Sequence, residues 1–267
     1  MPYVETQGIR MYYEERGAGE PLLLIMGITA RGNVWEKHVD AWQARFRCLT
    51  PDNRGVGLTD KPSGPYTSAL MADDFAGLLD ALGIAQARVV GCSMGSIIAQ
   101  QLALRHPQRV RSMVLMCPWA RCDRFTRDIF QHMADSKARL RPEEFMRYVQ
   151  LLIFAKSSWD DDAFHAEMLA ARQQAAVDPL PQPLYALEAQ AAACVGHNVL
   201  DELGRIQFPC LVIDGRDDAF TPVWMSQEIA ERIPHCDLHL YDHAGHAFHW
   251  ERLEDFNPRV LKWLEEH

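Results

Sequence analysis

Residues 88–106 join a short apolar run to a helical pattern through the turn Gly91-Cys92-Ser93-Met94-Gly95. Apolar residues precede this G-x-S-x-G pentapeptide and recur at helical spacing after it: Val89, Val90, Ile97, Ile98 and Leu102. The order predicts a buried strand, an abrupt turn and a helix. Such a turn holds the Ser93 hydroxyl clear of the backbone, beside a helix N-terminus that suits a developing negative charge. The same pattern also fits a turn that only packs a strand against a helix, with the serine incidental.

The two glycines of this turn have a steric role in the prediction. A Cβ atom at Gly91 or Gly95 would collide with the neighbouring strand or helix if the turn is as tight as the spacing indicates. We therefore expect both positions to lie against backbone.

Short apolar runs alternate with helical patterns along most of the chain. Residues 2–16 predict a hairpin, and further strands are predicted at 21–26, 47–51, 88–92, 110–116, 210–215 and 238–241. Helices are predicted at 35–46, 71–82, 224–232 and 256–266, in addition to the one after Ser93. This alternation predicts an α/β fold with a mostly parallel central sheet and helices on both faces.

Residues 119–200 interrupt the alternation. They carry helical patterns at 124–136, 142–154, 160–176 and 184–194, and no convincing strand. We expect a core formed by residues 1–118 and 201–267, with 119–200 inserted as a helical cap over a cleft. The aromatic residues of the insertion predict an apolar pocket, although most of them must pack within the insertion itself.

Four residues of the insertion are predicted to contact a substrate: Trp119, Arg121, Phe125 and Tyr148. Arg121 begins a group with Arg124 and Arg127 that suits either a substrate carboxylate or a solvated helix face.

Composition excludes several classes of protein. The chain has 267 residues, 48% of them hydrophobic, and a formal net charge of −9, with no basic run that would bind nucleic acid. Its seven cysteines are scattered without a C-x-x-C pair, which indicates a reducing compartment. Neither a secretory signal nor a membrane-spanning run is visible, so a cytoplasmic location is expected, with no membrane partner. No oligomeric state is predicted.

A serine nucleophile needs a base and an orienting acid, and candidates follow the last two predicted strands. Asp214, Asp217 and Asp218 lie at the end of 210–215, and three histidines follow 238–241: His243, His246 and His249. Both sets therefore fall at the sheet edge where Ser93 is expected. The spacing of the histidines also suits a metal site, but no carboxylate or cysteine pattern completes one, so no metal is expected.

With these segments in this order, the chain resembles the alpha/beta-hydrolase superfamily. The resemblance covers nearly the whole chain. The family pattern G-x-x-D-x-x-x-P is similar to 215–222, and G-H-x-x-x-x-E is similar to 245–251. A third pattern, D-x-R-G-x-G-x-S-D, is similar to 52–60, with Thr59 in place of serine, and predicts a structural loop held by Arg54 and Asp60. The resemblance implies the alpha/beta-hydrolase fold, Ser93 as nucleophile, Asp218 as acid and His246 as base, without a cofactor.

The resemblance also implies an oxyanion hole formed by the backbone N–H groups of Ile28 and Met94. Where the family usually has His-Gly after its first long strand, this chain has Met26-Gly27. Both donors are main-chain groups, so the hole does not need the histidine, but the anchoring of its loop becomes an open question.

These observations predict a serine hydrolase of a carboxylic ester or lactone of a small apolar molecule, acting through an acyl-enzyme. One alternative is a carbon–carbon bond hydrolase of a dienoate ring-fission (meta-cleavage) product, which uses the same three residues. Another is a ligand-binding protein that kept the fold without turnover.

Overall fold

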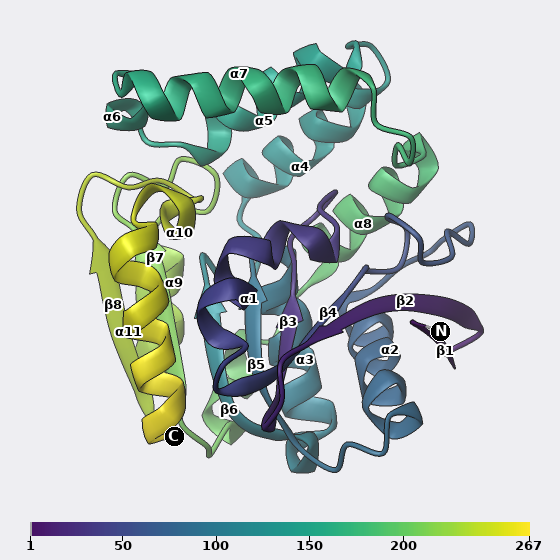
Figure 1. The fold of residues 1–267 in the computed structure, drawn as a ribbon, viewed down its shortest axis with the longest axis vertical. Coiled ribbons are helices and arrows are strands. Elements are labelled where there is room, and N and C mark those ends of the chain that lie inside the picture. Colours follow the sequence, from purple (N-terminus) through teal and green to yellow (C-terminus); the bar gives the residue numbers. More distant parts are fainter. Residues whose placement is uncertain (1) are drawn as a thin grey trace.

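The computed structural model describes residues 2–267 and is built around one eight-stranded sheet (Figure 1). The strand order is β1-β2-β4-β3-β5-β6-β7-β8. The strands are β1 (Tyr3–Thr6), β2 (Ile9–Arg16), β3 (Glu20–Ile25), β4 (Phe46–Pro51), β5 (Ala87–Cys92), β6 (Val110–Met116), β7 (Cys210–Gly215) and β8 (Cys236–Tyr241).

Strand pairing follows the predicted arrangement. β4, β3, β5, β6, β7 and β8 pair in parallel, while β1 pairs antiparallel with β2 and β2 antiparallel with β4. The predicted hairpin at 2–16 is confirmed, and its turn places Gly8 at a φ of 70°. Parallel strands end at one edge of the sheet, so the segments that follow β3, β5, β7 and β8 meet there.

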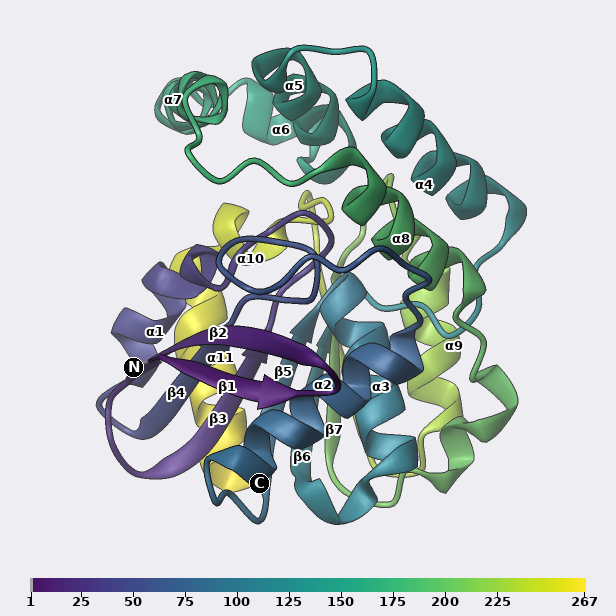
Figure 2. The same cartoon turned by 90° about the vertical axis from the view of Figure 1, so that its right-hand side faces the viewer.

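Helices cover both faces of the sheet (Figure 2). On one face α2 (Ser68–Ala81), α3 (Met94–Arg105) and α9 (Trp224–Arg232) pack against side chains such as Ile25, Val89 and Val212. On the other face α1 (Glu36–Trp42) and α11 (Leu253–Glu266) pack against alternate residues of the same strands: Leu24, Val90 and Ile213. Strands buried on both faces explain the continuous apolar runs in the sequence.

A group of helices, here called the inserted helices, lies in the chain between β6 and β7. It comprises α4 (Arg124–Lys137), α5 (Pro142–Ile153), α6 (Lys156–Trp159), α7 (Asp162–Ala176) and α8 (Leu184–Gly196). Figure 2 shows them at the end of the molecule where the parallel strands terminate. Two short helices, α6 and α10 (Phe248–Glu251), were not predicted, because a single helical turn has too few residues to show a periodic pattern.

Three 3₁₀ helices complete the described secondary structure: η1 (Gly32–Trp35), η2 (Pro107–Arg109) and η3 (Leu200–Arg205). Among residues 2–267, no helix combines the length and the apolar character required to traverse a bilayer.

Candidate active site

Ser93 stands in a strained turn between β5 and α3. Its φ of 54° and ψ of −119° lie outside the regions that residues with a side chain usually adopt. A Cβ added at Gly91 would lie 2.4 Å from the carbonyl oxygen of Gly95, and one at Gly95 would lie 2.0 Å from that of Ile25. The predicted steric need for glycine at both positions is confirmed, and the turn is tight because backbone from β3 and α3 closes around it.

His246 and Asp218 are in direct contact at the end of β7 and β8. Nδ1 of His246 lies 2.7 Å from Oδ2 of Asp218, and both side chains are buried. A carboxylate only accepts hydrogen bonds, so this contact assigns the imidazole proton to Nδ1 and leaves Nε2 as an acceptor. Asp217 is exposed and Asp214 accepts from Ser226, so among the three candidate aspartates the contact belongs to Asp218.

Asp218 is held by its own loop. Its Oδ1 accepts from the backbone N–H groups of Phe220 (2.7 Å) and Thr221 (2.9 Å). The Thr221 hydroxyl lies 3.0 Å from both Asp218 Oδ2 and His246 Nδ1. Thr221 was missed in the sequence analysis, although it stands inside the G-x-x-D-x-x-x-P segment, because a threonine beside a proline is also an ordinary loop residue.

Asp214 is a second buried carboxyl close to this pair. Burial and the neighbouring Asp218 carboxylate raise the pKa of Asp214 well above its ordinary value. Its oxygens accept from the backbone N–H of Gly215 and from the Ser226 hydroxyl. Asp214 therefore supports the end of β7 and does not compete for the imidazole.

The free imidazole nitrogen faces a thiol in this conformation. His246 Nε2 lies 3.5 Å from Sγ of Cys117, the buried residue that follows β6 and has a φ of 42°. The Ser93 hydroxyl is buried and has no hydrogen-bond partner among residues 2–267. Ser93 and His246 nevertheless line the same cavity, and hydrogen bonds of catalytic groups often form only when substrate is bound.

A buried chain of thiols and imidazoles extends from Cys117 along one side of the cavity, whose lining includes Cys92 and His249. Cys117 Sγ lies 3.9 Å from Cys92 Sγ, which lies 4.0 Å from Nε2 of His249. Nδ1 of His249 contacts Nε2 of His38 at 2.9 Å. Burial lowers the pKa of His38 to about 4 and raises that of the Cys117 thiol, so His38 and Cys117 are neutral near pH 7.

The three histidines that suggested a metal site point to different partners. His246 contacts Asp218, His249 contacts His38, and His243 is exposed. In the part of the chain that the structure describes, no group of three or more histidine, cysteine or acidic side chains is arranged to hold a metal ion.

The predicted oxyanion donors lie beside Ser93. A Cβ added at Gly27 would come within 3.2 Å of Ser93 Cβ and 3.7 Å of its hydroxyl oxygen, so the loop after β3 passes close to the serine. The N–H groups of Ile28 and Met94 make no hydrogen bond within residues 2–267, and Met94 opens α3. Both N–H groups are thus free to donate to a ligand at the helix N-terminus.

The loop at 52–60 is structural, and its polar residues connect it to neighbouring elements. Asp52 accepts from the backbone N–H groups of Gly32 and Leu58, both at 2.8 Å. Arg54 forms a buried bidentate pair with Asp74 on α2, and Asp60 accepts from the N–H of Arg10. The predicted anchoring by Arg54 and Asp60 is confirmed, with each residue bonded to a different element.

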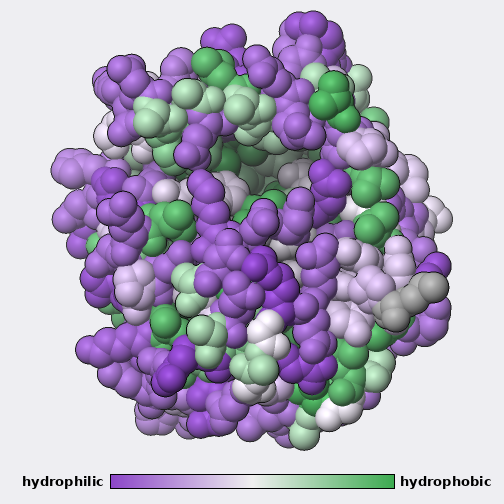
Figure 3. Space-filling view, in the orientation of Figure 1, coloured by the Kyte–Doolittle hydropathy of each residue, from purple (hydrophilic) through white to green (hydrophobic). Residues whose placement is uncertain are grey.

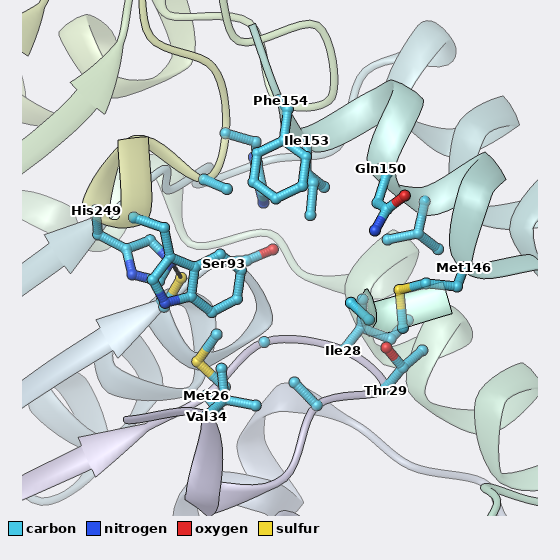
Figure 4. Close-up of a pocket in the computed structure, with 18 of the residues that line it drawn as sticks. Met26, Ile28, Thr29, Val34, Ser93, Met146, Gln150, Ile153, Phe154 and His249 are labelled. Carbon is cyan, nitrogen blue, oxygen red and sulfur yellow. Dashed lines mark hydrogen bonds between the residues drawn. The ribbon is translucent and has the colours of Figure 1, made fainter. Parts of the chain in front are cut away.

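Ser93 opens onto a cavity of about 580 Å³ between the core and the inserted helices (Figure 3). Figure 4 shows the Ser93 hydroxyl near its centre, with Gln150 and Met146 of α5 on one side. Met26 from the loop after β3 and Val34 of η1 lie below. Most of the lining is apolar: Met26, Ile28, Val34, Met133, Met146, Val149, Ile153, Phe154, Phe164, Met168, Phe220 and Trp250.

The four residues predicted to contact substrate do not line this cavity, which corrects that expectation. Trp119 is fully buried, packs against Phe130 and donates from Nε1 to the carbonyl of Cys194. Phe125 and Arg121 are exposed, and Tyr148 packs beside Phe145 and His132. Arg124 and Arg127 are also exposed, so the three arginines form a solvated surface. Other residues of the insertion form the wall, among them Met133, Met146 and Met168 together with Phe154 and Phe164, because the inward face of each helix is set by tertiary packing that aromatic content does not reveal.

Two ion pairs cross the cavity rim between the core and the inserted helices. Arg31 pairs with Asp178 at 3.1 Å, and Lys37 pairs with Glu167 at 3.3 Å. All four residues are among those that line the cavity. Each cation at the rim is thus matched by a carboxylate.

Glu251 ties the loop of His246 to the inserted helices. One of its oxygens accepts from the N–H of Gly245, and the other accepts from the N–H of Ala155 and from the Ser158 hydroxyl. The N–H of Ala247 donates to the carbonyl of Ile153 at 2.8 Å. The end of α5 is therefore docked on the loop that carries the imidazole.

A family model described as the alpha/beta hydrolase fold matches residues 20–253. The chain therefore belongs to the alpha/beta hydrolase fold family, and it is a hydrolase.

Known relatives extend over the whole chain. A Mycobacterium tuberculosis protein named as the non-heme bromoperoxidase BpoC is 34% identical over 262 residues, which are 96% of this chain and 98% of that protein. An Azorhizobium caulinodans protein named as the carbamate hydrolase RutD is 31% identical over 266 residues, covering 100% of this chain and 99% of that one. A thermophilic esterase of Thermogutta terrifontis superposes with a TM-score of 0.85 at 26% identity, covering 99% of this chain and 97% of that one.

Proposed function

We propose that this hydrolase cleaves a carboxylic ester or lactone of a small apolar molecule through a Ser93–His246–Asp218 triad and an acyl-enzyme. The observation that carries the proposal is the buried His246–Asp218 contact at 2.7 Å, in the same cavity as a strained serine whose hydroxyl has no partner among residues 2–267.

In the proposed mechanism His246 Nε2 takes the proton of the Ser93 hydroxyl as its oxygen attacks the substrate carbonyl carbon. Asp218 holds the Nδ1 proton and stabilises the imidazolium that forms. The N–H groups of Ile28 and Met94 donate to the new oxyanion, at roughly 3–4 kcal/mol each in known enzymes. His246 then protonates the leaving alcohol, and water attacks the acyl-enzyme with His246 as base.

The cavity supports an uncharged substrate. Its wall is apolar, and its rim cations Arg31 and Lys37 are already paired with Asp178 and Glu167. A carboxylate buried in this wall would lack a dedicated partner, which costs several kcal/mol or more. A neutral acyl group fits without that cost, and the inserted helices serve as the cap that covers it.

The alternative of a carbon–carbon bond hydrolase uses the same triad but a dienoate substrate. Such a substrate carries a carboxylate, so the paired rim cations favour the ester or lactone. The alternative of a binding protein without turnover is opposed by the retained contact of His246 with Asp218.

A substrate screen with an active-site label tests the proposal. Wild type is expected to be labelled by a fluorophosphonate at Ser93 and to hydrolyse p-nitrophenyl esters, with no action on a vinylogous diketone dienoate. Ser93→Ala should abolish both labelling and hydrolysis.

Ser112→Ala is the matched control, since Ser112 is also a buried serine without a hydrogen-bond partner among residues 2–267, but it lies on β6 and outside the cavity lining. It should behave as wild type. Turnover of the dienoate without ester hydrolysis would favour the carbon–carbon hydrolase, and folded protein that takes no label would favour the binding protein.

A further inference from the structure

We propose that Gln190 and Asn53 are positioning residues for the oxyanion hole. These two buried side-chain amides hold the two ends of the segment Met26–Thr29, and so hold the Ile28 N–H beside Ser93. The inference rests on the proposed function, because it assigns to this segment a role in stabilising an oxyanion.

The segment needs external anchors. It follows the end of β3, lies outside regular secondary structure and contains Thr29 at a φ of 68°, a left-handed conformation that is costly for a residue with a branched side chain. The Met26 side chain has no polar hydrogen with which to fix its own loop. Contacts from elsewhere in the molecule must therefore hold the strained backbone in place.

Gln190 supplies the anchor at the Thr29 end. It belongs to α8 and is fully buried. Its Oε1 accepts from the Thr29 N–H at 3.2 Å and from Nε2 of Gln182 at 2.9 Å, and its Nε2 donates to the carbonyl of Arg54 at 2.8 Å. With a donor and an acceptor both engaged, the amide is fixed in one orientation.

Asn53 supplies the anchor at the Met26 end. Its side chain is 1% exposed, and its Nδ2 donates to the Met26 carbonyl at 2.7 Å. Between the two anchors, the Thr29 N–H is occupied by Gln190, whereas the Ile28 N–H has no partner in residues 2–267. The contacts thus leave the Ile28 N–H available to donate to a ligand.

Loss of either amide leaves a buried backbone group unpaired and lets the strained segment relax. A displacement of the Ile28 N–H weakens a hydrogen bond that becomes strong only when the oxyanion forms. We therefore expect kcat to fall roughly 10- to 100-fold, while KM changes little.

The test compares two inhibitors of one shape. The Ser93 oxygen adds to the carbonyl carbon of a trifluoromethyl ketone, and the serine proton passes to His246. The carbonyl oxygen then becomes an oxyanion that lies in the oxyanion hole. The matching methyl ketone binds without appreciable addition. In Gln190→Met, which is similar in length but lacks the amide, affinity for the trifluoromethyl ketone should fall with kcat, and affinity for the methyl ketone should stay at the wild-type value.

Gln190→Glu keeps an acceptor for the Thr29 N–H and is expected to retain more of kcat than Gln190→Met. Gln100→Met is the matched control, because Gln100 is also fully buried on a helix and donates to a carbonyl, that of Trp119, away from the segment. Its thermal midpoint should fall, but its kcat and the ratio of the two inhibitor affinities should not change.

Equal losses of both inhibitors in Gln190→Met, or wild-type kcat in that variant, would overturn the inference. If Gln190→Met does not fold, Asn53→Leu provides the same comparison at the other end of the segment, with the same outcomes for and against. Failure of wild type to react with the trifluoromethyl ketone or a fluorophosphonate would instead overturn the proposed function, so the two failures are distinguishable.

Discussion

The loops at the sheet edge and the inserted helices build opposite halves of the cavity by different means. In the loops, polar contacts fix individual atoms, as between Asp218 and His246 or between Asn53 and the Met26 carbonyl. In the inserted helices, the cavity wall is formed mostly by flexible apolar side chains such as Met133, Met146 and Met168. If the proposed function holds, the core supplies the reacting groups, and the insertion supplies much of the wall that a substrate contacts.

The largest expected effect separates the two neighbouring aspartates of the core. Asp218→Asn should reduce kcat by about 10⁴-fold, because an amide facing Nδ1 no longer holds the required imidazole tautomer. Asp217→Asn should change kcat little, since Asp217 is exposed. Steady-state kinetics on one ester measures both. The reverse pattern would move the acid to Asp217.

A pair of glycine substitutions compares the two regions in stability. Gly95→Ala would bring a Cβ within 2.0 Å of the Ile25 carbonyl oxygen, so we expect a loss of about 4 kcal/mol or more in the free energy of unfolding. Gly196→Ala, at the exposed end of α8, meets no atom of residues 2–267 within 4 Å and should be neutral or slightly stabilising. Urea unfolding measures both. Equal losses would contradict the contrast.

Acid should destabilise the core through His38. Its pKa is lowered to about 4 in the folded protein, against an ordinary value of 6.5, so the unfolded chain binds the proton more readily between these values. The contribution to stability is complete above pH 6.5 and is lost as the pH falls towards 4, by about 3 kcal/mol for this group.

The loss of thermal midpoint between pH 6.5 and 4.5 should therefore be smaller in His38→Gln than in wild type. His132→Gln, at an exposed position of α4, is the control and should keep the wild-type slope. An unchanged slope in His38→Gln would show that His38 does not carry this pH dependence.

The smallest effect is expected from the wall of the inserted helices. Met146→Ala enlarges the cavity and should shift preference between p-nitrophenyl acetate and decanoate by about 10-fold in kcat/KM towards the longer chain. Phe125→Ala removes an aromatic residue that is 55% exposed and outside the cavity lining, and should leave the ratio unchanged. A shift in Phe125→Ala of equal size would place substrate elsewhere on the insertion.

The contrast between the loops at the sheet edge and the inserted helices also explains which features were predictable from sequence. The sheet follows from apolar runs separated by helical patterns, and the turn at Ser93 follows from the Gly91 and Gly95 spacing, because both depend on local sterics. The loop positions of Asp218 and His246 follow from motifs at the ends of strands, and the structure brings these two side chains into contact.

Contacts between distant segments were not predictable. Gln190 reaches Thr29 across 161 positions of sequence, and Cys117 reaches His246 across 129, with no local pattern to indicate either contact. The cavity wall was missed for a related reason, since aromatic content does not say whether Trp119 faces a ligand or its own helices. Side-chain direction on the inserted helices depends on packing that only the folded chain defines.

The carboxylate of Glu251 constrains how a ligand reaches the serine. If Ala155 and Ser158 moved away from the loop that carries His246, the half-buried Glu251 side chain would lose two hydrogen-bond donors. This side of the insertion is therefore held firmly to the core. Across the cavity, Arg31–Asp178 and Lys37–Glu167 are partly hydrated pairs, worth about 1 kcal/mol or less each. If the proposed function holds, we expect substrate to enter and product to leave at the α7 rim, where these weaker contacts join the inserted helices to the core.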